Sequence, residues 1–193
     1  MKVEALTGPA LVKALPDVAR LRIGVFRDFP YLYYGNLAYE ANYLQTYRDS
    51  PQAIIVGASH NNQLVGVSTG TPLLESADDF SNALKGTGID LREVFYCAES
   101  VLLPQYRGRG LGHRFFEVRE AHARAHGFRY CCFCSVIRPA DHPARPADYR
   151  PLDPFWRARG YAPLPGAVAR FDWTDLGDTK PSTKSLQVWI RAL

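Results

Sequence analysis

Long apolar runs are missing from this sequence. No stretch approaches the ~20 consecutive apolar residues that cross a bilayer, and even the run at residues 94–104 is interrupted by Glu99. The opening residues MKVEALTG place Glu4 where a secretory signal peptide has its apolar segment. We therefore expect a cytoplasmic protein that has no membrane partner.

Cysteine is scarce, and its placement argues against disulfides. The cysteines lie in hydrophobic runs, and three of them are almost adjacent, which is a poor disulfide framework. A zinc site combining Cys131 and Cys134 with His122 and His126 would need its cysteines on a tight turn, whereas successive strand residues point to opposite faces. We expect buried thiols and no metal. The four cysteines are Cys97, Cys131, Cys132 and Cys134.

Extremes of composition and charge are absent too. Of the 193 residues, 47% are hydrophobic and 22% are charged, which excludes a disordered or fibrous chain. Lys and Arg number 23 and Asp and Glu 19, and the net charge of +4 argues only weakly for an anionic partner. No repeat or Gly/Ser linker divides the chain, so we expect one domain over residues 1–193.

The hydrophobic pattern predicts an α+β (mixed α/β) fold, with a mixed sheet of six to seven strands and about four helices. A strand at 3–6 is expected before helices at 9–26 and 38–47, a hairpin at 53–70, a short helix at 77–84 and a central strand at 93–103. A helix at 111–126, a strand at 128–137, a loop or flap at 139–154, a helix at 154–159 and a hairpin of 168–173 with 185–190 complete the chain. Because short loops join strand, helix and strand in a βαβ unit, the strands at 93–103 and 128–137 should be parallel.

Glycines recur at every second position before the helix at 111–126, in the segment PQYRGRGLG of residues 104–112. Glycines let the backbone approach a ligand closely, and unpaired N–H groups of a first helical turn attract phosphate. Arg107 and Arg109 add positive charge. Neither a P-loop nor a Gly-x-Gly-x-x-Gly fingerprint fits the segment. We expect a cradle for a pyrophosphate; the alternative is a tight turn with solvated arginines.

The pattern Arg107-x-x-Gly110-x-Gly112, after an apolar strand and before an amphipathic helix, resembles the acyl-coenzyme A signature of the GNAT N-acetyltransferase superfamily. The order of the other elements resembles that superfamily over nearly the whole chain. The resemblance implies a GNAT-like fold and transfer of an acetyl group from acetyl-coenzyme A to a primary amine of a small molecule or peptide. It also implies that backbone groups of Val101, Leu102 and Leu103 bind the pantetheine arm. The implied pyrophosphate contacts are Arg107, Gly108, Arg109, Gly110, Leu111, Gly112 and His113.

Acetyl transfer from a thioester requires a neutral amine, a polarised carbonyl and a proton for the leaving thiolate. Glu99 is the predicted base, because an ionisable group in an apolar strand must be paired, neutralised or functional. Counting with period two puts Glu99 on one strand face with Cys97 and Val101. The alternative is a structural carboxylate bonded to a neighbouring strand or an arginine. Glu93 and Glu40 are weaker candidates for the base.

The general acid is not evident from the sequence. The family commonly places a tyrosine four residues before a Gly-aromatic pair, and Trp156 stands there, four residues before Gly160. Tryptophan has no dissociable proton near neutral pH, so Tyr149 or water remain alternatives.

The acceptor is expected where the first two helices meet. Residues 29–43 are rich in aromatic side chains around one acid, which would suit an amine with an apolar or aromatic body. Tyr31, Tyr33 and Glu40 are the predicted substrate-binding residues.

Two rival functions are considered. A catalytically silent acyl-coenzyme A sensor or regulatory domain would keep the cradle and explain Trp156. A nucleic-acid binder is disfavoured, because Arg114, Arg119 and Arg124 are five residues apart and spread around their helix. The expected partners are therefore acetyl-coenzyme A and an amine, and the terminal hairpin would allow a homodimer.

Overall fold

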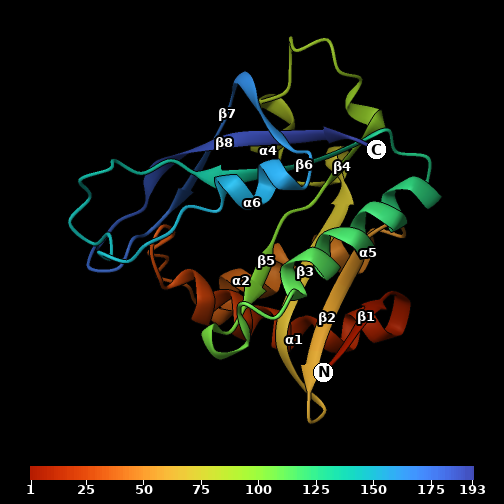
Figure 1. The fold of residues 1–193 in the computed structure, drawn as a ribbon, viewed down its shortest axis with the longest axis horizontal. Coiled ribbons are helices and arrows are strands. Elements are labelled where there is room, and N and C mark those ends of the chain that lie inside the picture. Colours follow the sequence, from red (N-terminus) through yellow and green to blue (C-terminus); the bar gives the residue numbers. More distant parts are fainter.

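The computed structural model describes residues 1–193 as a mixed sheet with helices on both faces (Figure 1). The eight-stranded sheet has the order β1-β2-β3-β4-β6-β8-β7, and β5 pairs with β3 beside this path. The predicted α+β class is confirmed. The strands are β1 Lys2–Leu6, β2 Ile54–His60, β3 Gln63–Pro72, β4 Val94–Tyr96, β5 Ser100–Leu102, β6 Tyr130–Val136, β7 Ala162–Trp173 and β8 Ser182–Ala192.

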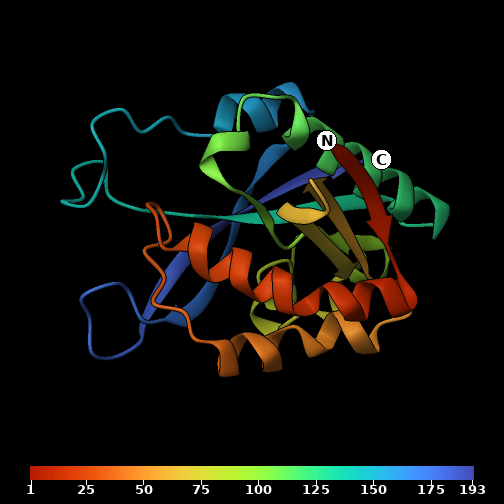
Figure 2. The same cartoon turned by 90° about the horizontal axis from the view of Figure 1, so that it is seen from below.

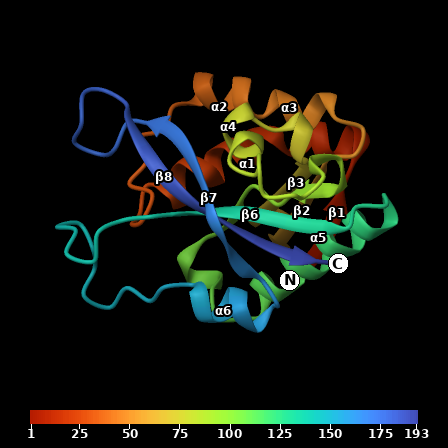
Figure 3. The ribbon, with the colours of Figure 1, turned by 90° about the horizontal axis from the view of Figure 1, so that it is seen from above.

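Figure 3 shows the helices α1 to α4 on one face of the sheet and α5 and α6 on the other. Figure 2 shows α1 running beside the α2–α3 pair, and contacts of α1 with α2 and α3 agree with that view. The single helix expected at 38–47 is divided at Leu44, so six helices form from the five ranges expected to be helical, against the overall expectation of about four. The helices are α1 Gly8–Phe26, α2 Leu37–Tyr43, α3 Gln45–Asp49, α4 Asp78–Asn82, α5 Leu111–Ala125 and α6 Asp153–Ala158.

The expected central strand at 93–103 is broken, which raises the strand count to eight. β4 pairs with β6 in parallel, as predicted, whereas β5 pairs antiparallel with β3 and not with β6. Residues 97–99 between them belong to no strand. β5 and β6 therefore part beyond the break and leave a gap in the sheet.

The break also changes which face each side chain occupies. Cys97 packs in the core on the α5 side together with Phe95, whereas Val101 packs with Val67 on the α1 side. The expectation that Glu99 shares a face with both Cys97 and Val101 was wrong for Cys97. An irregularity in a strand shifts the alternation of side chains, so period-two counting fails across it.

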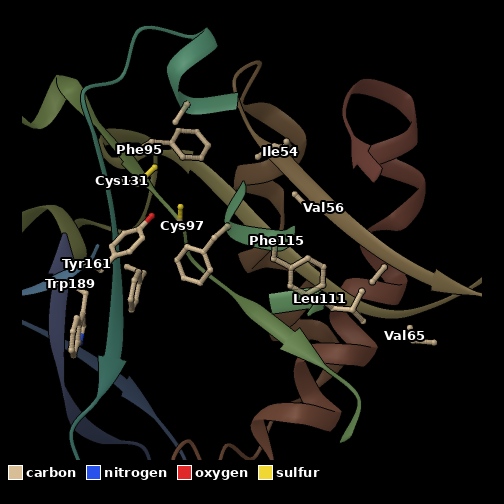
Figure 4. Packing of buried hydrophobic residues seen from close by; sticks show 14 residues of the cluster. Ile54, Val56, Val65, Phe95, Cys97, Leu111, Phe115, Cys131, Tyr161 and Trp189 are labelled. Atoms are coloured by element: carbon tan, nitrogen blue, oxygen red, sulfur yellow. The ribbon is translucent and has the colours of Figure 1, made fainter. Parts of the chain in front are cut away.

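The core beneath α5 contains Phe115, Cys97, Cys131 and Tyr161, whose side chains converge in Figure 4. All four cysteines are buried and unbridged, as predicted from their apolar surroundings. No group of three or more His, Cys, Asp or Glu side chains is arranged to hold a metal ion. None of the helices combines the length and the apolar character needed to traverse a bilayer.

One sheet contains strands from both ends of the chain, from β1 to β8. That continuity agrees with a single domain over residues 1–193, which stays a prediction.

Candidate active site

The glycine-rich segment lies between β5 and α5. A short 3-10 turn, Pro104–Tyr106, follows β5, and α5 begins at Leu111. Gly108 and Gly110 have φ angles of 73° and 77°, a left-handed conformation that glycine adopts without steric cost. These two glycines turn the chain into α5.

The turn leaves a series of main-chain donors unused. The first backbone hydrogen bond of α5 runs from the N–H of Arg114 to the carbonyl of Gly110, at 3.3 Å. None of the six N–H groups from Gly108 to His113 donates to an acceptor in the protein. Together with the positive end of the helix dipole, they form a site that favours an anion such as a diphosphate.

The two arginines of the segment are exposed beside these donors. Arg107 Nε donates to the carbonyl of Leu102 at 3.1 Å, and Arg109 Nη2 donates to the carbonyl of Gln105 at 3.1 Å. Arg109 also lies 5.6 Å from the ring centroid of Tyr106. Each guanidinium uses one nitrogen for the turn and keeps further donors for a ligand.

Close packing of α6 completes this end of the molecule. The rings of His113 and Phe155 pack edge to face, with their centroids 4.9 Å apart. A Cβ on Gly112 would lie 3.3 Å from Phe155 Cζ, tighter than a usual contact. Glycine at 112 therefore lets α6 approach the first turn of α5.

The gap between β5 and β6 exposes fewer backbone groups than expected. The N–H of Leu103 donates to the carbonyl of Val65, and the carbonyl of Leu103 accepts from the N–H of Tyr106, both at 3.0 Å. Because hydrogen-bonded pairs alternate along an antiparallel ladder, Val101 bonds to Val67, and Leu102 is directed away from β3. Of the three residues expected to bind pantetheine, only Leu102 keeps a main-chain group for the gap, its N–H, because its carbonyl accepts from Arg107 Nε. Val101 and Leu103 use both of theirs within the protein.

Arg119 of α5 binds main-chain and side-chain groups beside the break in the central strand at residues 97–99. Its side chain is buried, and it donates to the carbonyls of Thr69 and Glu99 at 3.1 and 2.9 Å and to Ser100 Oγ at 2.9 Å. No carboxylate pairs with it. In the sequence, Arg119 differs from the other arginines of this helix only in its spacing of three and four residues from Phe116 and Phe115, which is the signal for the buried face.

On the opposite face of the sheet, Glu99 is buried and surrounded by donors. Arg22 Nη1 and Thr69 Oγ1 donate to its carboxylate, as do the hydroxyls of Tyr43 at 2.6 Å and Tyr47 at 3.1 Å. A carboxylate has about four acceptor directions, so these four donors occupy them. The expected alternative, a carboxylate bonded to an arginine and a neighbouring strand, describes these contacts.

Arg22 of α1 joins two buried carboxylates. Its Nε donates to Glu40 at 2.5 Å, while its Nη1 donates to Glu99. Burial lowers the pKa of the guanidinium, but the nearby charges of Glu99, Tyr43 and Glu40 outweigh that effect and hold the pKa well above its ordinary value. Arg22 was not singled out from the sequence. Its place on the apolar face of α1, four residues before Phe26, was the signal.

Aromatic side chains enclose a cavity of about 70 Å³ beside Arg22 and Glu99. Tyr31 and Tyr33 line it, as expected for the acceptor site. Glu40 does not line it: the residue is fully buried, and Arg22 and Tyr33 hold its carboxylate. The lining residues are Arg22, Phe26, Tyr31, Tyr33, Tyr39, Tyr43, Phe80, Tyr96, Ala98, Glu99, Cys134, Phe171, Trp173 and Leu186.

The two candidates for the general acid lie apart from this cavity. Trp156 packs between Phe133 and Trp189, with ring centroids 5.0 and 5.1 Å away. Tyr149 lies in the segment between β6 and α6 and lines a separate cleft of about 370 Å³ together with Arg157 and Trp189. Glu93, the other weaker base candidate, forms a surface ion pair with Arg129 at 3.2 Å.

The sequence matches the Acetyltransferase (GNAT) family over residues 18–147, about two thirds of the chain. The chain therefore belongs to this family, and it is an acyltransferase.

Solved structures of several acetyltransferases have the same fold as this chain. Ribosomal-protein-alanine N-acetyltransferase from Brucella melitensis has a TM-score of 0.63 at 12% identity, with 100% of both chains covered. An N-acetyltransferase from Staphylococcus aureus Mu50 has a TM-score of 0.62 at 9% identity, covering 100% of this chain and 99% of that one. PaiA N-acetyltransferase from Thermoplasma acidophilum, solved in complex with coenzyme A, has a TM-score of 0.54 at 10% identity, with 100% of both chains covered. No curated protein matches the sequence.

Proposed function

We propose that this protein transfers an acetyl group from acetyl-coenzyme A to a primary amine of a small molecule or peptide, by direct attack of the amine on the thioester. The observation that carries this proposal is a pair of sites on the two faces of the sheet, on either side of the broken central strand. The unused N–H groups of Gly108 to His113 lie on the α5 side, and the aromatic cavity lies on the α1 side, with Glu99 at the break between them.

The residues present fit the diphosphate of coenzyme A. Six unused main-chain donors and two arginines lie in this short segment, and a Cβ at Gly108 or Gly110 would meet no other atom within 4 Å, so the approach is open. Arg107, Gly108, Arg109, Gly110, Leu111, Gly112 and His113 would hold the diphosphate. Leu102, whose N–H faces the gap between β5 and β6 and whose carbonyl is held by Arg107, would bind the pantetheine arm through that N–H.

Proton removal is assigned to Tyr43 and Glu99 together. Glu99 has no free acceptor direction, so an amine cannot reach it directly. Tyr43 lines the cavity, and its hydroxyl donates to Glu99 at 2.6 Å. As the new N–C bond forms, the amine proton passes to the Tyr43 oxygen while the Tyr43 proton passes to Glu99, which leaves no phenolate behind.

Burial, and then the charge of Glu99, raise the pKa of Tyr43 well above its ordinary value. A standing phenolate base is therefore disfavoured, and the concerted relay is the route that the contacts support. The leaving thiolate takes its proton from water, because Trp156 cannot supply one and coenzyme A thiols, like the cysteine thiol, have a pKa near ~8 to 9.

The alternative is a silent acyl-coenzyme A sensor or regulatory domain. Trp156 in place of the family's tyrosine and the full set of hydrogen bonds on Glu99 favour this alternative. Release of free thiol separates the two functions. The protein is incubated with acetyl-coenzyme A and a panel of amines, and the thiol is followed by absorbance with a disulfide reagent.

The proposal expects thiol release that depends on both the amine and the protein. Calorimetry with coenzyme A provides the control. Binding of coenzyme A without release on any amine contradicts turnover and supports the sensor, whereas absence of binding contradicts both. A cytoplasmic location and a homodimer through the β7–β8 hairpin remain proposals.

A further inference from the structure

The aromatic cavity has an unusual combination of walls and charges for a site that receives an amine. Aromatic rings form much of its wall. Tyr31 stacks on Phe26 with ring centroids 4.2 Å apart, and the centroid of Trp173 lies 6.2 Å from that of Tyr31. On the other side, Phe80 stacks on Phe171 at 5.4 Å and on Tyr96 at 4.6 Å. Such walls favour a flat apolar group, which gains aromatic contacts beyond simple burial.

The charges lining the cavity are already matched. Only Arg22 and Glu99 contribute formal charges to the wall, and they form an ion pair with each other. Glu40, held by Arg22 and Tyr33, adds a second carboxylate outside the lining, and the guanidinium of Arg119, which donates to the carbonyl of Glu99 and has no carboxylate partner, offsets its charge. An ammonium ion entering the cavity would therefore meet a guanidinium and find no carboxylate with a free acceptor direction.

This arrangement makes the binding of a cation in the cavity unfavourable in free energy. A buried charge without a partner is strongly unfavourable, and the phenol oxygens of the wall are neutral acceptors. The rings offer some cation–π attraction, but Arg22 already lies 4.2 Å from the Tyr43 ring centroid and 5.3 Å from that of Phe26. The site is better matched to an amine that enters uncharged.

We infer that the acceptor is a weakly basic amine carried on a flat ring, such as an arylamine, which enters the cavity as the neutral base. This inference rests on the proposed function and names its substrate class. A nitrogen of this kind is neutral at about pH 7 and needs no proton removed before it attacks. The Tyr43–Glu99 relay then has one task, which is to take the proton that becomes acidic as the N–C bond forms.

Size agrees with this substrate class. A cavity of about 70 Å³ admits one small group, with the amino nitrogen directed to Ala98 and Glu99 at the break. The rest of the acceptor extends past Tyr39, which is exposed. A single-ring amine meets both conditions.

Aniline and cyclohexylamine provide a matched pair for the test, because both are six-membered-ring amines but only cyclohexylamine is protonated at pH 7. Binding of each amine to the protein saturated with coenzyme A is measured by calorimetry from about pH 7 to pH 9. No turnover occurs in this experiment, because coenzyme A has no acetyl group to transfer. Aniline is expected to bind equally across this range. Cyclohexylamine is expected to bind about tenfold more tightly for each pH unit, because only its rare neutral form enters. Cyclohexanol, which does not titrate, is the control for ring binding.

The tyrosines and the cysteine that line the cavity stay protonated in this range. Burial raises the pKa values of the lining tyrosines Tyr31, Tyr33, Tyr39, Tyr43 and Tyr96 above their ordinary value. Burial also raises the pKa of Cys134 to about 12. Arg22 stays charged. A slope of one log unit per pH unit would therefore report on the ligand.

A second measurement localises the binding. Tyr31→Leu should weaken aniline about tenfold, since its ring lies against Phe26 and Trp173. Tyr34→Leu, an exposed aromatic residue outside the cavity, is the matched control and should bind as the unaltered protein does. Melting curves of both variants verify that each is folded.

Cyclohexylamine that binds equally at pH 7 and pH 9, or more tightly than aniline at pH 7, would overturn the inference. Failure of both ring amines to bind would overturn it too, while thiol release on other amines would leave the proposed function standing. Binding of aniline without thiol release from acetyl-coenzyme A would also overturn the inference, because a bound amine that is not acetylated is not the acceptor.

Discussion

At the scale of single residues, Arg22 and Tyr43 determine what Glu99 can do. Glu99 stands where sequence patterning expects a catalytic base, but Arg22 and three hydroxyls occupy its carboxylate. Of the three hydroxyl donors, only that of Tyr43 belongs to a residue lining the cavity, and it lies 2.6 Å from Glu99. The base is therefore a pair of residues, with the phenol in contact with substrate.

Replacing Tyr43 by Phe should lower kcat about 10²-fold, because it keeps the ring and removes the hydroxyl that conducts the proton. Affinity for coenzyme A should not change, since Tyr43 lies on the α1 side of the sheet. Steady-state thiol release measures the first quantity and calorimetry the second. Tyr34→Phe removes an exposed hydroxyl and is the control. An unchanged kcat would contradict the relay.

Glu99→Gln allows a sharper comparison. Two residues that act as one unit give strongly non-additive effects. The double variant with Tyr43→Phe should thus lose no more turnover than Glu99→Gln alone. Losses that multiply would mean that the two residues act independently.

At the scale of elements, the junction between β5 and α5 is the decisive feature. Gly108 and Gly110 turn the chain with left-handed φ angles, so that α5 begins without a side-chain cap and six N–H groups stay unpaired. At its other end, α5 is followed by Gly127, which has a φ angle of 82°. The same backbone conformation thus occurs at both ends of the helix, but only the first end has the array of unused donors and the two arginines.

Gly110→Asp should weaken coenzyme A binding by tenfold or more, about 1.4 kcal/mol, because it places a carboxylate beside the diphosphate. Gly127→Asp is a matched control: it imposes the same left-handed strain of roughly 1 to 2 kcal/mol on the same helix, away from the cradle. Calorimetry with coenzyme A measures both variants. Equal losses in the two variants would show that strain, rather than the added charge, is responsible.

At the scale of the whole molecule, one arginine connects segments that are distant in the chain. Arg138, just after β6, donates to the carbonyls of Pro30 and Tyr31 at 2.8 Å. It also pairs with Asp175 in the β7–β8 connection at 2.7 Å, and Lys184 lies 3.2 Å from the same carboxyl group. This cluster holds Tyr31 at the cavity wall.

The cluster should give the protein an acid-sensitive part of its stability. Burial raises the pKa of Asp175, but hydrogen bonds from Arg138 and Lys184 outweigh it and hold the pKa below its ordinary value. A lowered pKa means that the contribution is present above about pH 4 and is lost as pH falls through the pKa of the folded state. The free energy of unfolding, measured in urea from about pH 6 to pH 3, should therefore decline at the acid end.

Asp175→Asn should reduce stability by about 1 to 3 kcal/mol at pH 6 and flatten the acid decline. Asp178→Asn removes an exposed carboxylate of the same connection that has no ion pair and should leave the curve unchanged. A variant of Asp175 that keeps the full acid decline would place its cause in other carboxylates.

The sequence by itself determined the α+β class, the parallel pairing around α5, the buried thiols and the glycine-rich turn, because each depends on local periodicity or on a short run of neighbours. It could not show that the central strand breaks at residues 97–99, since apolar residues stand on both sides of Glu99 and only pairing with β3 and β6 reveals the break. Nor could it show that Arg22 reaches Glu99 across 77 positions, or that Leu103 uses its N–H within the sheet. Those facts depend on which distant segments become neighbours, which is decided when the sheet and its helices pack together.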